Sequence, residues 1–161
     1  MMGGLKIGRG PLIRAVAISI ASGLGSGCFA PIIGPVALAS PGWISSETPV
    51  VWRPSTAAPE LTGELFFASH ADGSRFVQFS KGGLPIVVAQ QSTGGWRISS
   101  SLRSGRFGGH GSPPSSVVWF QLRSVPPTSM SPPWVVTNLS NGGWVVVHSG
   151  TGEMLEGPGN P

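Results

Sequence analysis

The chain has 161 residues, about the length of one ordinary domain. Only 10% of the residues are charged, whereas 25 are glycine and 16 are proline; six Trp and seven Phe still supply apolar surface for a modest core, which excludes a wholly disordered protein. Three of the ten basic residues precede Cys28, which leaves seven basic against six acidic residues from there on. This near balance, with aromatic residues explained by a core, predicts no nucleic-acid partner.

The N-terminus has the order of a secretory signal peptide. MMGGLKIGRGPLIR (1–14) carries three positive charges and no acid, and AVAISIASGL (15–24) is an apolar run followed by small residues. The run is too short to cross a bilayer, which takes about 20 apolar residues. The glycines and prolines that follow it oppose a longer continuous helix. We therefore expect an exported protein.

Cys28 is the only cysteine of the chain, and it follows small residues. The sequence SGC resembles the cleavage site of bacterial lipoproteins, which implies a signal peptide over 1–28 and a mature N-terminus lipidated on Cys28. Two alternatives stay open: ordinary cleavage after the ALA of residues 37–39, and a retained anchor or a wrongly assigned start. Each signal-type interpretation places the protein outside the cytoplasm. A single cysteine forms no internal disulfide, so the domain must hold together without one.

Residues 29–59 combine repeated prolines with small and apolar residues and show no helical periodicity. This composition is typical of an extended, semi-rigid tether. Trp43 and Trp52 are unusual in a tether and suggest contact with the domain or a membrane interface.

From residue 60 the sequence changes to short segments rich in Val, Phe, Trp and Ile, separated by turn residues such as ADGS, STGG and SNGG. No segment shows the apolar repeat of a helix. We expect an all-β domain over 60–157 with little helix, after a disordered N-terminal segment: a single curved antiparallel sheet or a half-open β-barrel. Segments 107–116 and 123–134 are expected as loops. The eight expected strands are 61–70, 74–80, 84–91, 95–101, 116–122, 134–139, 143–149 and 152–157.

Alternation within the strands assigns their faces. Val77 and Phe79 oppose Phe76, and Trp96 and Ile98 oppose Arg97 and Ser99. An apolar sheet face without a covering helix must curl on itself or take a partner or an apolar ligand. We expect the concave face to carry either core residues or ligand contacts at Phe67, Phe79, Val88, Trp96, Ile98, Phe120 and Val146.

Charge and chemistry point away from catalysis. Between Asp72 and Glu153 there is no acid but six basic residues, and we expect three of these, Arg97, Arg103 and Arg106, to meet an anionic headgroup. The three histidines lack metal-ligand spacing, and no serine lies in a GxSxG turn. The sequence therefore predicts no enzyme, no metal and no cofactor.

The segment TGELFFASHADGSRFVQFSKGGLPIVVAQQ (62–91), in an exported chain with a lipoprotein-like cysteine, resembles the outer-membrane lipoprotein carrier and receptor families of the LolA/LolB type. The resemblance implies a half-open β-barrel whose concave apolar face receives acyl chains. The chain lacks the helices that cover the cavity in that family, and segment 123–134 is the only candidate substitute.

The functional hypothesis is a lipid-anchored protein of the periplasm or outer membrane of a Gram-negative-type envelope. It would bind an apolar or acyl-chain ligand, or a lipoprotein, in lipid or lipoprotein trafficking. The rival hypothesis is a structural or protein-interaction module of the envelope, with a filled interior and no ligand cavity. A third is a degenerate homologue of the carriers without transport activity.

Overall fold

The computed structural model describes residues 33–34, 36–102 and 105–158. The predicted signal peptide, the lipidation candidate Cys28 and the headgroup candidate Arg103 lie outside the described residues.

The described residues form nine strands and one helical turn, which confirms the predicted all-β fold class. All strands join one antiparallel sheet in the order β6-β5-β4-β3-β2-β1-β9-β8-β7. Because β6 and β7 are the edges and do not pair with each other, the sheet is curved but not closed. The elements are β1 (Trp43–Arg53), β2 (Leu61–His70), β3 (Arg75–Lys81), β4 (Leu84–Ser92), β5 (Gly95–Ser100), β6 (Gly105–His110), α1 (Val118–Gln121), β7 (Trp134–Asn138), β8 (Trp144–His148) and β9 (Met154–Gly157).

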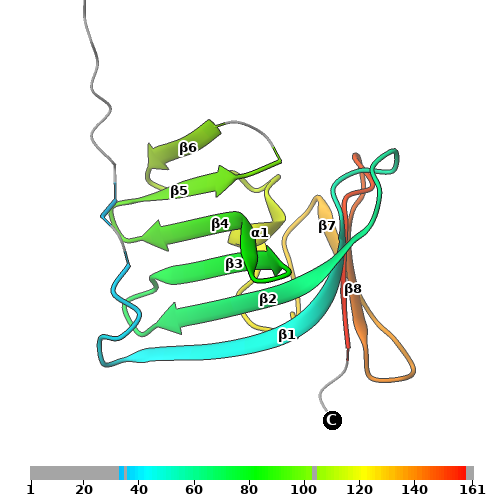
Figure 1. Cartoon of the computed structure of the whole chain (residues 1–161), viewed down its shortest axis with the longest axis horizontal. Helices are drawn as coiled ribbons and strands as arrows, with labels where there is room; N and C mark the ends of the chain where they lie inside the picture. Colours follow the sequence, from blue (N-terminus) through cyan, green and yellow to red (C-terminus); the bar gives the residue numbers. More distant parts are fainter. Residues whose placement is uncertain (1–32, 35, 103–104, 159–161) are drawn as a thin grey trace, which may run out of the picture.

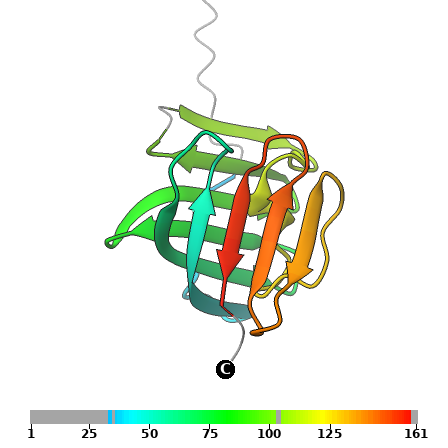
Figure 2. The ribbon, with the colours of Figure 1, turned by 90° about the vertical axis from the view of Figure 1, so that its right-hand side faces the viewer.

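The sheet folds over on itself along its longest strand. β1 pairs with β2 from Trp43 to Trp52, but with β9 only from Val51 to Arg53. Strands β2–β6 lie side by side on one side of this fold, with β7–β9 seen edge-on (Figure 1). From the side, β1, β9, β8 and β7 cross in front of the other strands (Figure 2). Two inner faces of one sheet therefore enclose the core.

Strand β1 corrects the predicted domain boundary. The tether expected over 29–59 is wrong for 43–53, because this segment is a paired strand of the sheet. Val50 and Trp52 alternate onto the buried face, and Trp52 is a core residue. Pro49, which favoured the tether, lies where β1 has no partner on the β9 side, since that pairing begins at Val51. A proline is tolerated at such an edge position because its missing N–H removes no ladder bond there.

The segment 116–122 is the second correction. It forms the single turn α1 instead of a strand, and Val118, Trp119, Phe120 and Leu122 are all buried. Neighbouring residues of a strand point to opposite faces, so a strand with one solvent face cannot bury three in succession. A short turn lying inside the curved sheet can. Part of the expected loop 107–116 is also a strand, since β6 extends to His110.

Turn α1 completes the core between the two halves of the sheet. The Trp119 ring packs 5.0 Å from the Trp52 ring and 5.9 Å from the Phe79 ring, centroid to centroid. Phe120 packs edge-on against Trp96 at 5.5 Å. Such aromatic pairs add to the free energy of burial itself. The predicted inward alternation of Val77 and Phe79 on β3 is confirmed, because both belong to this core.

Arg75 of β3 attaches the α1 segment to the sheet. Its Nη1 donates to the carbonyl oxygens of Phe120 (3.1 Å) and Leu122 (3.0 Å), and its Nη2 donates to Oε1 of Gln91 on β4 (2.6 Å). Burial, together with the charge of Arg123, lowers the pKa of the Arg75 guanidinium below its ordinary value. The guanidinium thus satisfies carbonyls at the end of a helical turn that has no basic residue of its own.

We predict that Arg75→Gln lowers the free energy of unfolding by about 2 kcal/mol, because carbonyls in a buried segment lose their charged donor. Chemical denaturation measures the change. Arg123→Gln is the matched control, since it removes an equal charge from an exposed side chain near the same segment. An equal loss of stability in both variants would contradict the role given to Arg75.

Gly63 of β2 gives a second stability prediction. A Cβ at this position would meet the carbonyl oxygen of Ser80 and, at 2.8 Å, the Phe79 ring. Gly63→Ala should therefore destabilise the fold by roughly 1–3 kcal/mol through overpacking. Gly94→Ala is the control, because a Cβ there meets no atom closer than 4.0 Å. Thermal unfolding of both variants tests the difference, and a Gly63→Ala protein as stable as Gly94→Ala would refute the close approach.

Candidate functional site

The residues predicted to line a concave ligand face are mostly core. Phe67, Phe79, Phe120 and Val146 are buried, and Trp96 and Ile98 pack against them while partly exposed. Their partners are the residues of α1 and the opposite half of the sheet. The apolar face is therefore covered by the chain itself over most of its area.

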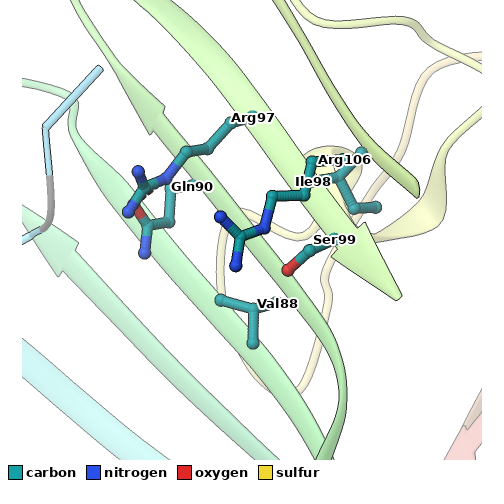
Figure 3. Close-up of a pocket in the computed structure, with 6 residues that line it drawn as sticks. All are labelled: Val88, Gln90, Arg97, Ile98, Ser99 and Arg106. Carbon is teal, nitrogen blue, oxygen red and sulfur yellow. Dashed lines mark hydrogen bonds between the residues drawn. The ribbon is translucent and has the colours of Figure 1, made fainter. Parts of the chain in front are cut away.

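Val88 is the exception, and its predicted place on the concave face is wrong. Its neighbours Val87 and Ala89 on β4 point into the core, so Val88 points to the opposite, convex face. There it lies in one recess with Arg97 and Arg106 (Figure 3).

An apolar cavity lies on the inner side of the sheet. It has a volume of about 380 Å³ and lies between strands β4–β6, the end of β1 and the start of α1. Two of its apolar side chains are exposed at the rim: Leu102, at 51%, and Phe107, at 62%. Its apolar lining consists of Trp52, Pro54, Val87, Ile98, Leu102, Phe107, Val117 and Trp119.

The polar groups of this cavity are few. Ser99, Ser100 and Ser116 contribute to the lining, and Glu153 is the one charged side chain among the described lining residues. The Trp52 Nε1–H donates to Oε1 of Glu153 at 2.9 Å, which orients both side chains at the cavity. A mainly apolar wall with a few convergent polar groups is the usual form of a small-molecule site.

The described arginines predicted to meet a headgroup do not flank this cavity. Arg97 and Arg106 extend from the convex face of β5 and β6, opposite Trp96 and Ile98. For Arg97 and Arg106, the predicted combination of a concave apolar chain and an adjacent arginine-bound headgroup is therefore not realised, whereas Arg103 lies outside the described residues. The carboxylate of Glu153 lies at the cavity instead.

Two further ionisable residues, His70 and Asp72, interact with each other and with neighbouring groups of the sheet. His70 Nδ1 lies 2.9 Å from Oδ1 of Asp72 in the β2–β3 turn, and the His70 ring packs against Trp43. The backbone N–H of Ser74 donates to Asp72, which, together with His70, lowers the pKa of this carboxyl. Among the described residues, no group of three or more His, Cys, Asp or Glu is placed to hold a metal ion.

Sequence reasoning missed most of the cavity, because Ile98 is the only predicted ligand contact among its lining residues. Trp52 fell in the expected tether, Trp119 and Val117 in an expected strand, and Leu102 and Phe107 outside any assigned face. The alternation of Val50 and Trp52 was a usable signal for the first. The uninterrupted run of Val117 to Phe120 gave no such signal, because a short apolar run fits a buried strand as well as a helix.

The comparisons with known proteins leave the chain without an assigned family. It matches no protein-family model and no curated protein sequence. The resemblance to the lipoprotein carriers and receptors therefore stays a prediction. In the part of the chain that the structure describes, no helix has the length and apolar character needed to cross a bilayer.

Proposed function

We propose that the protein is an envelope lipoprotein that binds one small apolar or single-chain lipidic ligand in the cavity between β4–β6 and α1. The observation that carries the proposal is an apolar recess left open beside an otherwise filled core, with Leu102 and Phe107 exposed at its rim. Exposed apolar side chains that gather at a cavity favour binding over plain solvation.

The size of the cavity limits the ligand. Its volume of about 380 Å³ is near the lower end of the range for small-molecule sites, roughly 300–1,000 Å³. Val118, Phe120 and Leu122 occupy the interior that a wider trough would offer to several acyl chains. A single chain or a compact apolar molecule fits this site better than the acyl groups of a lipoprotein. The shape of the site therefore supports a role in lipid trafficking more than it supports a role in lipoprotein transfer.

The proposed anchor at Cys28 is supported by the segment that follows it. The side chain of Ile33 is only 8% exposed, and its carbonyl oxygen accepts a hydrogen bond from Arg97 Nη1 at 3.1 Å. A mature chain that begins at Cys28 keeps this contact with the folded domain. Cleavage after Ala39 would remove Ile33 and leave Arg97 without that acceptor.

The filled core also favours the rival hypothesis of a protein-interaction module without a ligand. The two unpaired edge strands, β6 and β7, are the surfaces such a module would offer to a partner strand. The two hypotheses differ in one measurable property, which is the uptake of an apolar probe by the isolated protein.

We predict that the protein binds a neutral solvatochromic dye saturably and that a long-chain alcohol displaces it. Ser100→Trp should weaken dye binding about tenfold or more, since an indole added at the cavity wall fills space that the ligand needs. Fluorescence titration measures the affinity. Thr137→Trp is the matched control, because it adds the same indole to an exposed position of β7.

Phe107→Ser provides a second variant that leaves the core untouched, since the Phe107 side chain is largely exposed. It should weaken dye binding while the unfolding transition stays where it is. Absence of saturable binding to the unmodified protein, or equal binding by all three variants, would reject the ligand site and favour the interaction module.

A further inference from the structure

We propose a second, independent site: the recess on the convex face of β4–β6 binds a phosphate-type oxyanion through Arg97 and Arg106. The recess has a volume of about 220 Å³. Both guanidinium groups extend over the same side of the sheet, with Gln90 beside Arg97 and with Ser99 and Val88 close to Arg106 (Figure 3). The site lies on the opposite face of the sheet from the apolar cavity and does not depend on it.

Strand register brings the two arginines together. Ser99 of β5 pairs with Arg106 of β6, and Arg97 pairs with Gly108, so Arg97 and Arg106 are diagonal neighbours on one face. Diagonal positions lie within reach of long side chains. Gly108 puts no side chain opposite Arg97, and a Cβ there would come within 2.9 Å of the Trp96 carbonyl oxygen. No side chain of β6 therefore stands between Arg97 and Arg106 on this face.

Arg97 is held in place before any ligand arrives. Its Nε donates to Oε1 of Gln90 at 2.7 Å, and its Nη1 donates to the Ile33 carbonyl oxygen at 3.1 Å. Gln90 itself is only 6% exposed, which makes it a firm support. These bonds use two of the five N–H groups of the guanidinium. A positioned arginine loses less conformational entropy on binding an oxyanion.

Among the ion pairs of the described residues, none joins an acid to Arg97 or Arg106. The sequence has no Asp or Glu between Asp72 and Glu153, so β3–β6 carry none. The nearest sheet strand with an acid on this face is β2, whose Glu64 is three strand spacings from β5, roughly 14 Å. Asp72, in the β2–β3 turn, is paired with His70. Two cations that share one recess repel each other, and an oxyanion between them removes this cost.

A phosphate-type oxyanion matches the donors. The planar guanidinium presents paired N–H groups that bind two oxygens of a phosphate at once. The hydroxyl of Ser99, opposite Arg106, adds a neutral donor of the kind found at such sites.

Two sources of this chemistry are a lipid headgroup and a soluble phosphate. Ile33, which contacts Arg97, is five residues from Cys28, and five residues span at most roughly 18 Å. An anchor at Cys28 would therefore keep the recess near a membrane surface. The preference for a lipid source rests on this proposed anchor, whereas the oxyanion site does not.

The test is an NMR titration of the full chain with Cys28→Ser, so that no acyl group contributes. Inorganic phosphate is added at constant ionic strength, and the Arg97 and Arg106 Nε–H signals are followed. We expect saturable shifts. In Arg106→Gln, the affinity for phosphate should fall about tenfold or more, because a charge-assisted donor is lost. Arg123→Gln, which removes an exposed arginine elsewhere, should bind as before.

Shifts that do not saturate, or an equal loss of affinity in Arg106→Gln and Arg123→Gln, would overturn the site. A second arm adds vesicles of phosphatidylcholine with and without phosphatidylglycerol. Vesicle binding that needs both phosphatidylglycerol and Arg106 identifies a lipid headgroup as the source. Phosphate binding without Arg106-dependent vesicle binding identifies a soluble phosphate. Because neither readout involves the apolar cavity, failure of this site and failure of the proposed function are separate results.

Discussion

The packing of residues 117–122 against the inner face of the sheet is the interaction on which the rest of the structure depends. A curved sheet that does not close leaves an apolar face exposed, and the described residues contain no longer helix to cover it. The single turn α1 packs against this face, and its Val118, Trp119 and Phe120 are all buried. Arg75 holds the carbonyl oxygens at the end of this turn. The part of the apolar face that the turn leaves uncovered forms the apolar cavity. The same segment therefore both stabilises the fold and limits the size of the cavity.

The strands could be predicted because their signals are local. Segments such as RFVQFSK and GWVVVHS are rich in Val, Phe and Trp and are bounded by turn residues, and the structure has strands at both, with Val77, Phe79, Trp144 and Val146 in the core. The predicted antiparallel sheet, unclosed and nearly without helix, followed from these local patterns. Face assignment from alternation was correct for Trp96, Ile98 and Arg97 for the same reason.

The errors occurred where burial depends on distant partners. Pro49 is compatible with β1 because β9, about a hundred residues later, begins its pairing just beyond it. Val117 to Phe120 reads as a strand until the curved sheet around it is known, since a short apolar run has no decisive period. Val88 was assigned to the wrong face because it lies in an uninterrupted apolar run, Leu84 to Ala89, which hides the alternation. The alternation becomes visible once Val87 and Ala89 are placed in the core. The cavity needs the placement of β1 and of α1 at once, because they supply Trp52 and Trp119 to its lining.

The two faces of the β4–β6 half offer opposite chemistry, and this separation follows from the period of the strands. On β5, Trp96 and Ile98 point inward, whereas Arg97 and Ser99 point outward, so a single strand supplies both an apolar wall and a cationic one. A ligand whose anionic head is held by the arginines can therefore place an apolar chain in the cavity only if that chain passes around the edge strand β6. Because β6 is unpaired on its outer side and carries Phe107 toward the cavity and Arg106 toward the recess, it is the one strand at which the two faces meet.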